Sequence, residues 1–108
     1  MRRIAVYNNE SFAGVLTESA PGSGYTFRYS EDYIASDGNP ISLTLPLRKE
    51  AYESEHLFPF FSNMLPEGAN RRMICRALRI DEDDIFGILR AMAGKDIIGS
   101  VGLKRIEE

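Results

Sequence analysis

The stretch FFSNMLPEG, residues 60–68, together with Arg71 and Arg72, decides how the second half of this chain folds. Its aromatic and aliphatic side chains have helical spacing, and its proline and glycine are residues that form turns. We therefore expect the end of a buried helix, a turn and the start of a second helix. The first of these helices is expected within residues 57–65, after an N-cap at Ser54, with its proline in the first turn.

Two more helices are expected after this turn. Residues 69–79 have helical periodicity, and a third helix is expected to begin at an Asp81 N-cap, because the acidic residues 82–84 suit a helix N-terminus. Gly94 is expected just beyond its end. The side chains predicted to face inward are Met73, Ile74, Ala77 and Leu78 in the earlier helix and Ile85, Ile88, Leu89 and Met92 in the later one.

The first half of the chain has the signals of β-strands. Apolar and polar residues alternate with a period of two, which is typical of a strand with one buried face, and a turn-rich tetrad at residues 8–11 separates the first two runs. The alternation in ISLTL is the cleanest of these patterns. The strands predicted are residues 4–7, 12–17, 25–29 and 41–45, with a last one at 97–106 interrupted by Gly99 and Gly102.

The order of these elements is strands, then helices, then a strand. It favours an α+β domain with a mainly antiparallel small sheet and about three helices packed on one face. The final strand is expected to return to that sheet. A chain of 108 residues suits one domain, residues 1–108.

Composition limits the classes of function. The formal net charge is −3 and the basic residues are spread out, so we do not expect autonomous DNA binding. The single cysteine, Cys75, excludes an intrachain disulfide and fits a reducing compartment. No apolar run approaches a transmembrane helix, and the first eight residues are too short for a signal peptide. We expect a cytoplasmic protein with no membrane contact.

No catalytic, cofactor or metal motif is found in the sequence. One histidine, His56, and one cysteine give no zinc pattern, and the acidic residues 82–84 lack the spacing of a calcium loop. Lys95 is not followed by the Ser or Thr of a phosphate-binding loop. The segment DIFG, residues 84–87, contains one residue too many for a kinase metal motif. We therefore expect no catalytic residue, no metal site and no cofactor.

Several motifs follow one another in a characteristic order: FFSNMLPEG with Arg71, then DDIFGIL at residues 83–89 and GKDIIGSV at 94–101. In this order the chain resembles the N-terminal domain of the HipA family of serine/threonine kinase toxins. The first half matches more loosely, through residues 14–16, 25–29 and 41–46.

The resemblance implies a partner rather than an activity. A full HipA-like toxin continues into a kinase core, which this sequence lacks. Free-standing versions resemble HipS of HipBST systems, where a separate kinase, HipT, acts beside HipB, a helix-turn-helix DNA-binding protein. By resemblance, the chain is expected to be an antitoxin that binds and inhibits a HipA- or HipT-like kinase. Two alternatives stay open: an isolated regulatory domain of such a kinase, or an assembly component of its repressor complex.

The turn after the first helix is the candidate partner-binding site. Proline and glycine stiffen it, so little entropy is lost on binding, and the neighbouring arginines suit acidic or phosphorylated surfaces. The alternative that it only connects two helices stays open. The candidate residues are Asn63, Leu65, Pro66, Glu67, Gly68, Asn70, Arg71, Arg72, Lys95 and Asp96.

Overall fold

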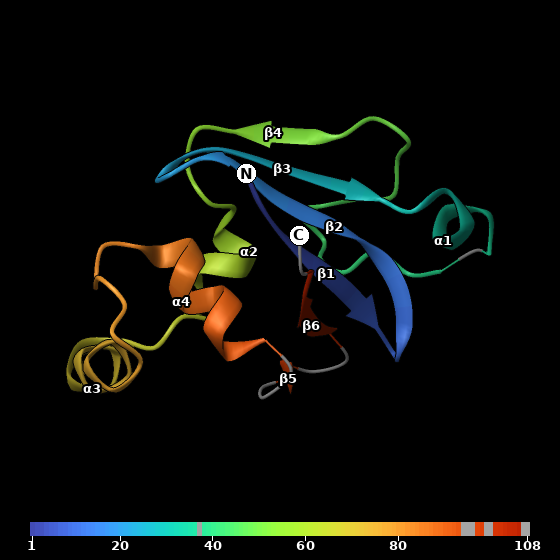
Figure 1. Ribbon diagram of the computed structural model, residues 1–108. Coiled ribbons are helices and arrows are strands. Elements are labelled where there is room, and N and C mark those ends of the chain that lie inside the picture. Colours follow the sequence, from blue (N-terminus) through green and yellow to red (C-terminus); the bar gives the residue numbers. More distant parts are fainter. Residues whose placement is uncertain (37, 94–96, 99–100, 107–108) are drawn as a thin grey trace.

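A computed structural model describes residues 1–36, 38–93, 97–98 and 101–106. Their strands form one six-stranded antiparallel sheet in the order β4-β3-β2-β1-β6-β5 (Figure 1). The strands are β1 (Arg2–Asn8), β2 (Ser11–Ala20), β3 (Ser23–Tyr29), β4 (Tyr52–Ser54), β5 (Ile97–Ile98) and β6 (Val101–Arg105). The helices are α1 (Glu31–Ala35), α2 (Pro59–Ser62), α3 (Gly68–Leu78) and α4 (Ile85–Met92).

Tight hairpins join β1 to β2 and β2 to β3. Between β1 and β2, Asn9 and Glu10 have φ values of 51° and 69°, the left-handed pattern of a two-residue type I′ loop. The predicted last strand is two strands, β5 and β6, which pair with each other. Pairing of β6 with β1 confirms that the C-terminal segment returns to the sheet.

Aromatic residues of β3 join the sheet to its helices. The period of two turns three of its side chains to the same face, and each meets a ring from a different helix. The pairs, with ring-centroid distances, are Tyr25 with Phe86 of α4 at 6.0 Å, Phe27 with Phe61 of α2 at 5.7 Å, and Tyr29 with Tyr33 of α1 at 6.1 Å. Three helices thus share one face of a mainly antiparallel sheet, and the α+β prediction is confirmed.

The strand predicted at residues 41–45 is wrong. The segment has only an isolated bridge, although Ile41 and Leu45 are buried as the alternation suggested. The hydroxyl of Tyr29 bonds this segment in place of a neighbouring strand. It accepts from the Ile41 amide at 3.1 Å and donates to the Leu45 carbonyl. Leu43, predicted to face inward with them, is 97% exposed.

The predicted helix at residues 57–65 is shorter and begins later than the pattern indicated. Ser54 ends β4, a strand that the sequence did not suggest, so it is not the N-cap. Phe58 is the N-cap residue, and Pro59 occupies the first turn of α2, where proline is tolerated. Leu57 is buried in the extended segment that leads into the helix.

Helix α3 has the predicted position but not the predicted burial. Met73 is 64% exposed and Leu78 45% exposed, Ala77 is also exposed, and Cys75 is its buried residue. Figure 1 shows the reason: α3 lies at one end of the molecule, away from the sheet, so the sheet does not cover its apolar side chains.

Helix α4 buries the predicted stripe but begins later than expected. Ile88 and Leu89 are buried and Ile85 and Met92 are half-buried. The N-cap is Asp84 rather than Asp81, which accepts instead from the Asp83 amide at 2.8 Å in the preceding turn. The predicted helix-ending Gly94 lies outside the described residues.

Over the described part of the chain, none of the helices has the length and apolar character needed to cross a bilayer.

Candidate protein-binding site

Backbone hydrogen bonds within the segment stabilise the start of the turn between α2 and α3. Asn63 keeps helical φ and ψ, and the amides of Met64 and Leu65 donate three residues back, at 3.1 and 3.2 Å. This tightens the end of α2. Leu65 is only 8% exposed, so its side chain anchors the turn in the core and is not part of the exposed surface.

Arg71 and Gly68 fix the second half of this turn. The Nε of Arg71, which is half-buried, donates to the Pro66 carbonyl at 3.1 Å, so this side chain braces the turn. Gly68 starts α3 with a φ of 56°, and a Cβ there would meet nothing within 4 Å. The position favours glycine because of its backbone conformation, not because of crowding.

The candidate residues therefore divide into supporting and exposed groups. Leu65, Pro66 and Arg71 are buried or half-buried and hold the turn. Lys95 and Asp96 lie outside the described residues. The structure brings the exposed ones together along the turn and the first turn of α3: Asn63, Glu67, Gly68, Asn70 and Arg72.

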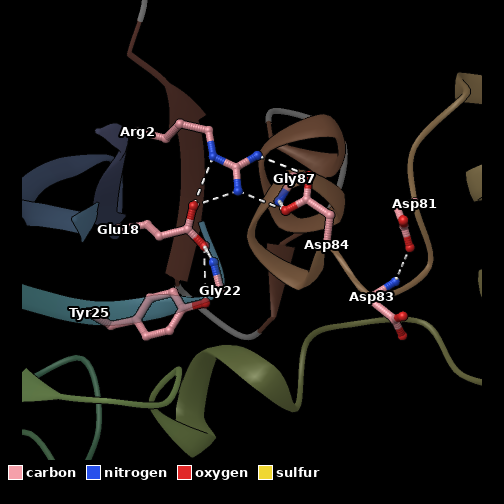
Figure 2. Close-up of polar contacts among 8 residues, drawn as sticks. All are labelled: Arg2, Glu18, Gly22, Tyr25, Asp81, Asp83, Asp84 and Gly87. Carbon is pink, nitrogen blue, oxygen red and sulfur yellow. Dashed lines mark hydrogen bonds and ion pairs between the residues drawn. The ribbon is translucent and has the colours of Figure 1, made fainter. Parts of the chain in front are cut away.

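A second polar cluster, which the sequence did not reveal, lies where β1, β2 and α4 meet (Figure 2). The guanidinium of Arg2 donates from Nη1 and Nη2 to both carboxylate oxygens of Asp84, at 3.0 and 2.7 Å. It also donates from Nε to Glu18, whose carboxylate is only 2% exposed, at 2.9 Å. Its carbon Cζ lies 5.4 Å from the centroid of the Phe86 ring.

Other donors complete this cluster. Glu18 accepts from the Tyr25 hydroxyl at 3.0 Å and the Gly22 amide at 3.2 Å, and Asp84 accepts from the Gly87 amide at 3.1 Å. The bond from Arg2 holds the pKa of Asp84 below its ordinary value. Burial, helped by the Glu18 carboxylate, raises the pKa of Tyr25 to about 12.

The cluster of Arg2, Glu18 and Asp84 is a structural lock. Its buried carboxylate is fully bonded, and its arginine binds two elements that are distant in sequence. Sequence separations of 16 and 82 residues explain why no local pattern could reveal it. Among the described residues, no three His, Cys, Asp or Glu side chains gather to hold a metal ion.

The sequence-family model described as the HipA N-terminal domain matches residues 4–104. This chain belongs to the HipA N-terminal domain family. A solved structure titled "N-terminal domain of HipA toxin" has a TM-score of 0.74 and 33% sequence identity, covering 100% of this chain and 95% of that chain. The resemblance and the expected fold are thus confirmed.

Relatives in this family differ greatly in length. A Haemophilus influenzae protein, named only as uncharacterized, is 34% identical over 104 residues, which cover 96% of this chain and 92% of that protein. A putative kinase of Sinorhizobium fredii, Y4mE, is 29% identical over 104 residues, or 95% of this chain. The match spans only 24% of that longer protein.

Proposed function

We propose that this domain is a non-catalytic, protein-binding antitoxin of a HipA-type toxin–antitoxin system, acting in the cytoplasm. Its target is a separate serine/threonine kinase of the HipA or HipT kind. The observation that carries this proposal is the match of residues 4–104 to the HipA N-terminal domain family. The similar length of the Haemophilus relative, 92% of which is covered, supports a domain that functions outside a kinase chain.

The turn between α2 and α3 suits a wedge that blocks kinase closure. Phosphoryl transfer requires the nucleotide-binding loop and the catalytic groups to reach one geometry. The brace from Arg71 to Pro66 and the buried anchor Leu65 hold the turn before it binds. A pre-ordered turn loses less entropy in a complex. The exposed Glu67 and Asn70 then offer polar contacts to the kinase.

A second candidate function is that of a regulatory domain at the N-terminus of a longer kinase. The match to 24% of the putative kinase Y4mE favours it. In that case the same turn would contact the kinase core of its own chain. The two candidates share one binding surface and differ in whether the kinase is a separate molecule.

A kinase assay at equal concentrations tests the proposal. The purified HipA-type kinase is mixed 1:1 with this domain, and phosphoryl transfer and complex formation are measured together. We expect a stable complex and loss of transfer. The exposed-turn variant Glu67→Arg should relieve inhibition, whereas the matched variant Glu50→Arg, on a distant exposed loop, should not. An unchanged rate in a saturated mixture would contradict the antitoxin function.

A further inference from the structure

The side of α3 that faces away from the molecule has two ordered rows. Residues four apart are neighbours on a helix surface. Ala69, Met73 and Ala77 form an apolar row, and Arg72 and Arg76 form a basic row beside it. All five are exposed, and we call them the α3 outer face. Its methionine is 64% exposed, although its spacing predicted a buried side chain.

The charge of α3 differs from that of the whole chain. Residues 68–79 contain four of the thirteen basic residues and none of the sixteen acidic ones, in a protein with a formal net charge of −3. Within the described residues, neither Arg72 nor Arg76 takes part in an ion pair. Two positive charges four residues apart repel each other slightly, so the row does not stabilise the helix itself.

We propose that the α3 outer face docks onto an acidic protein surface that has a shallow apolar pocket for Met73. A flexible thioether fits irregular pockets, and the alanines on either side let another backbone approach closely. The two arginines would give the contact its orientation and a fast association rate. The surface extends the exposed turn, since Arg72 is shared by both. The proposal rests on the proposed function in assigning the acidic surface to the kinase.

Charge complementarity favours a protein over a nucleic acid. The exposed acids Asp81, Glu82 and Asp83 lie three to five residues beyond the end of α3, and Glu67 directly precedes it. A phosphate backbone laid along the helix would approach these carboxylates at both ends. A protein surface can place acidic groups opposite Arg72 and Arg76 only, and the apolar row would have no use on a phosphate backbone.

A double charge reversal tests the assignment. Arg72→Glu/Arg76→Glu is compared with Arg28→Glu/Lys49→Glu, which changes the net charge equally at exposed positions on β3 and in the segment before β4. We expect the first variant to weaken kinase binding about tenfold or more, and to lose the salt dependence of association, whereas the second stays within about twofold of wild type. Circular dichroism and thermal unfolding check that both variants fold.

A second pair of variants tests the apolar row. Met73→Asp is expected to weaken kinase binding about tenfold, and Leu43→Asp, at a residue 97% exposed elsewhere, is expected to have no effect. Wild-type binding with undiminished binding of both α3 variants would overturn this inference and leave the proposed function standing. No binding by the wild type would contradict the proposed function and this inference together.

Two further measurements test whether a second copy of this chain or DNA binds the α3 outer face instead. Analytical ultracentrifugation of the wild type is expected to show a monomer, and a dimer dispersed by Arg72→Glu/Arg76→Glu would assign the face to a second copy. Fluorescence anisotropy with a labelled DNA duplex is expected to show no binding by the wild type. DNA binding that Arg72→Glu/Arg76→Glu abolishes would be the opposite result. Either opposite result would overturn the assignment to an acidic protein surface.

Discussion

Helices α3 and α4 are neighbours in the sequence, but they differ in how far they pack against the rest of the domain. In α4, Phe86 is fully buried against Tyr25, and the N-cap Asp84 is bonded to Arg2 at the start of the chain. In α3, Met73 is 64% exposed, and the long-range polar and aromatic contacts that hold α4 have no counterpart among its described residues. Both sequences have amphipathic spacing. The comparison teaches that helical spacing identifies an apolar face, while the position of the helix relative to the sheet determines whether that face is buried within the domain.

The lock at α4 gives the largest expected effect. Arg2→Ala would leave the Glu18 carboxylate, only 2% exposed, without its cation, and we expect a loss of about 3 kcal/mol in the free energy of unfolding. The control is Arg28→Ala, an exposed arginine on β3, expected to change it by less than about 0.5 kcal/mol. Urea unfolding measures both. Equal losses would show that the cluster does not hold α4.

Alanine substitutions at one glycine in each helix are expected to have the next largest effects on stability. A Cβ at Gly87 would lie 2.2 Å from Oδ2 of Asp84, so Gly87→Ala is expected to cost about 1–3 kcal/mol through distortion of the lock. Gly68→Ala, at the start of α3, is expected to cost only about 1 kcal/mol, because its Cβ is unobstructed and only the positive φ is unfavourable. Thermal and urea unfolding measure both losses.

Rescue by asparagine distinguishes the two causes. Asn tolerates the left-handed region, so Gly68→Asn should recover part of the loss. Gly87→Asn should recover nothing, because there the obstacle is the Asp84 carboxylate. Recovery at both positions would contradict a steric cause at Gly87.

Acid should weaken α4 in particular. The folded pKa of Asp84 is lowered by Arg2, so its contribution is fully present above the ordinary value of 3.8 and is lost as pH falls through the folded pKa. Stability should therefore fall at acid pH. Asp84→Asn is expected to be less stable at pH 7 and to show a flatter stability profile at acid pH than wild type. A parallel profile would contradict this origin of the acid sensitivity.

The smallest expected effect belongs to α3. Met73→Ser removes an exposed side chain and should change the free energy of unfolding by less than about 0.5 kcal/mol. Differential scanning calorimetry of the domain alone measures it. A loss above about 1.5 kcal/mol would show that Met73 is a core residue and that the outer face is not free to bind.

The spacing of apolar residues correctly predicted the strands and helices that bury one regular face. The alternation at Tyr25, Phe27 and Tyr29 identified β3, and the apolar stripe identified α4, because each is set by neighbours in sequence. The segment 41–45 misled because a single hydroxyl, that of Tyr29, replaced its strand partners. The family motif around residues 83–89 contains the cap Asp84 and Gly87.

Long-range features could not be predicted in this way. The contacts of Arg2 with Glu18 and Asp84 depend on how β1, β2 and α4 are brought together. The exposure of Met73 depends on where α3 lies relative to the sheet, which its own spacing does not specify. Within the candidate turn, the sequence did not separate the brace Arg71 from the exposed Arg72, since only the folded turn places the Pro66 carbonyl.

Hydrogen exchange with and without the HipA-type kinase tests most directly whether the α3 side is the binding region. In the free domain, amides of α3 should exchange faster than those of the central strands β1 and β2. On addition of the kinase, we expect new protection in residues 63–78 and no change in β1 and β2. Protection confined to the sheet, with residues 63–78 unchanged in a formed complex, would contradict the assignment of kinase binding to the α3 side.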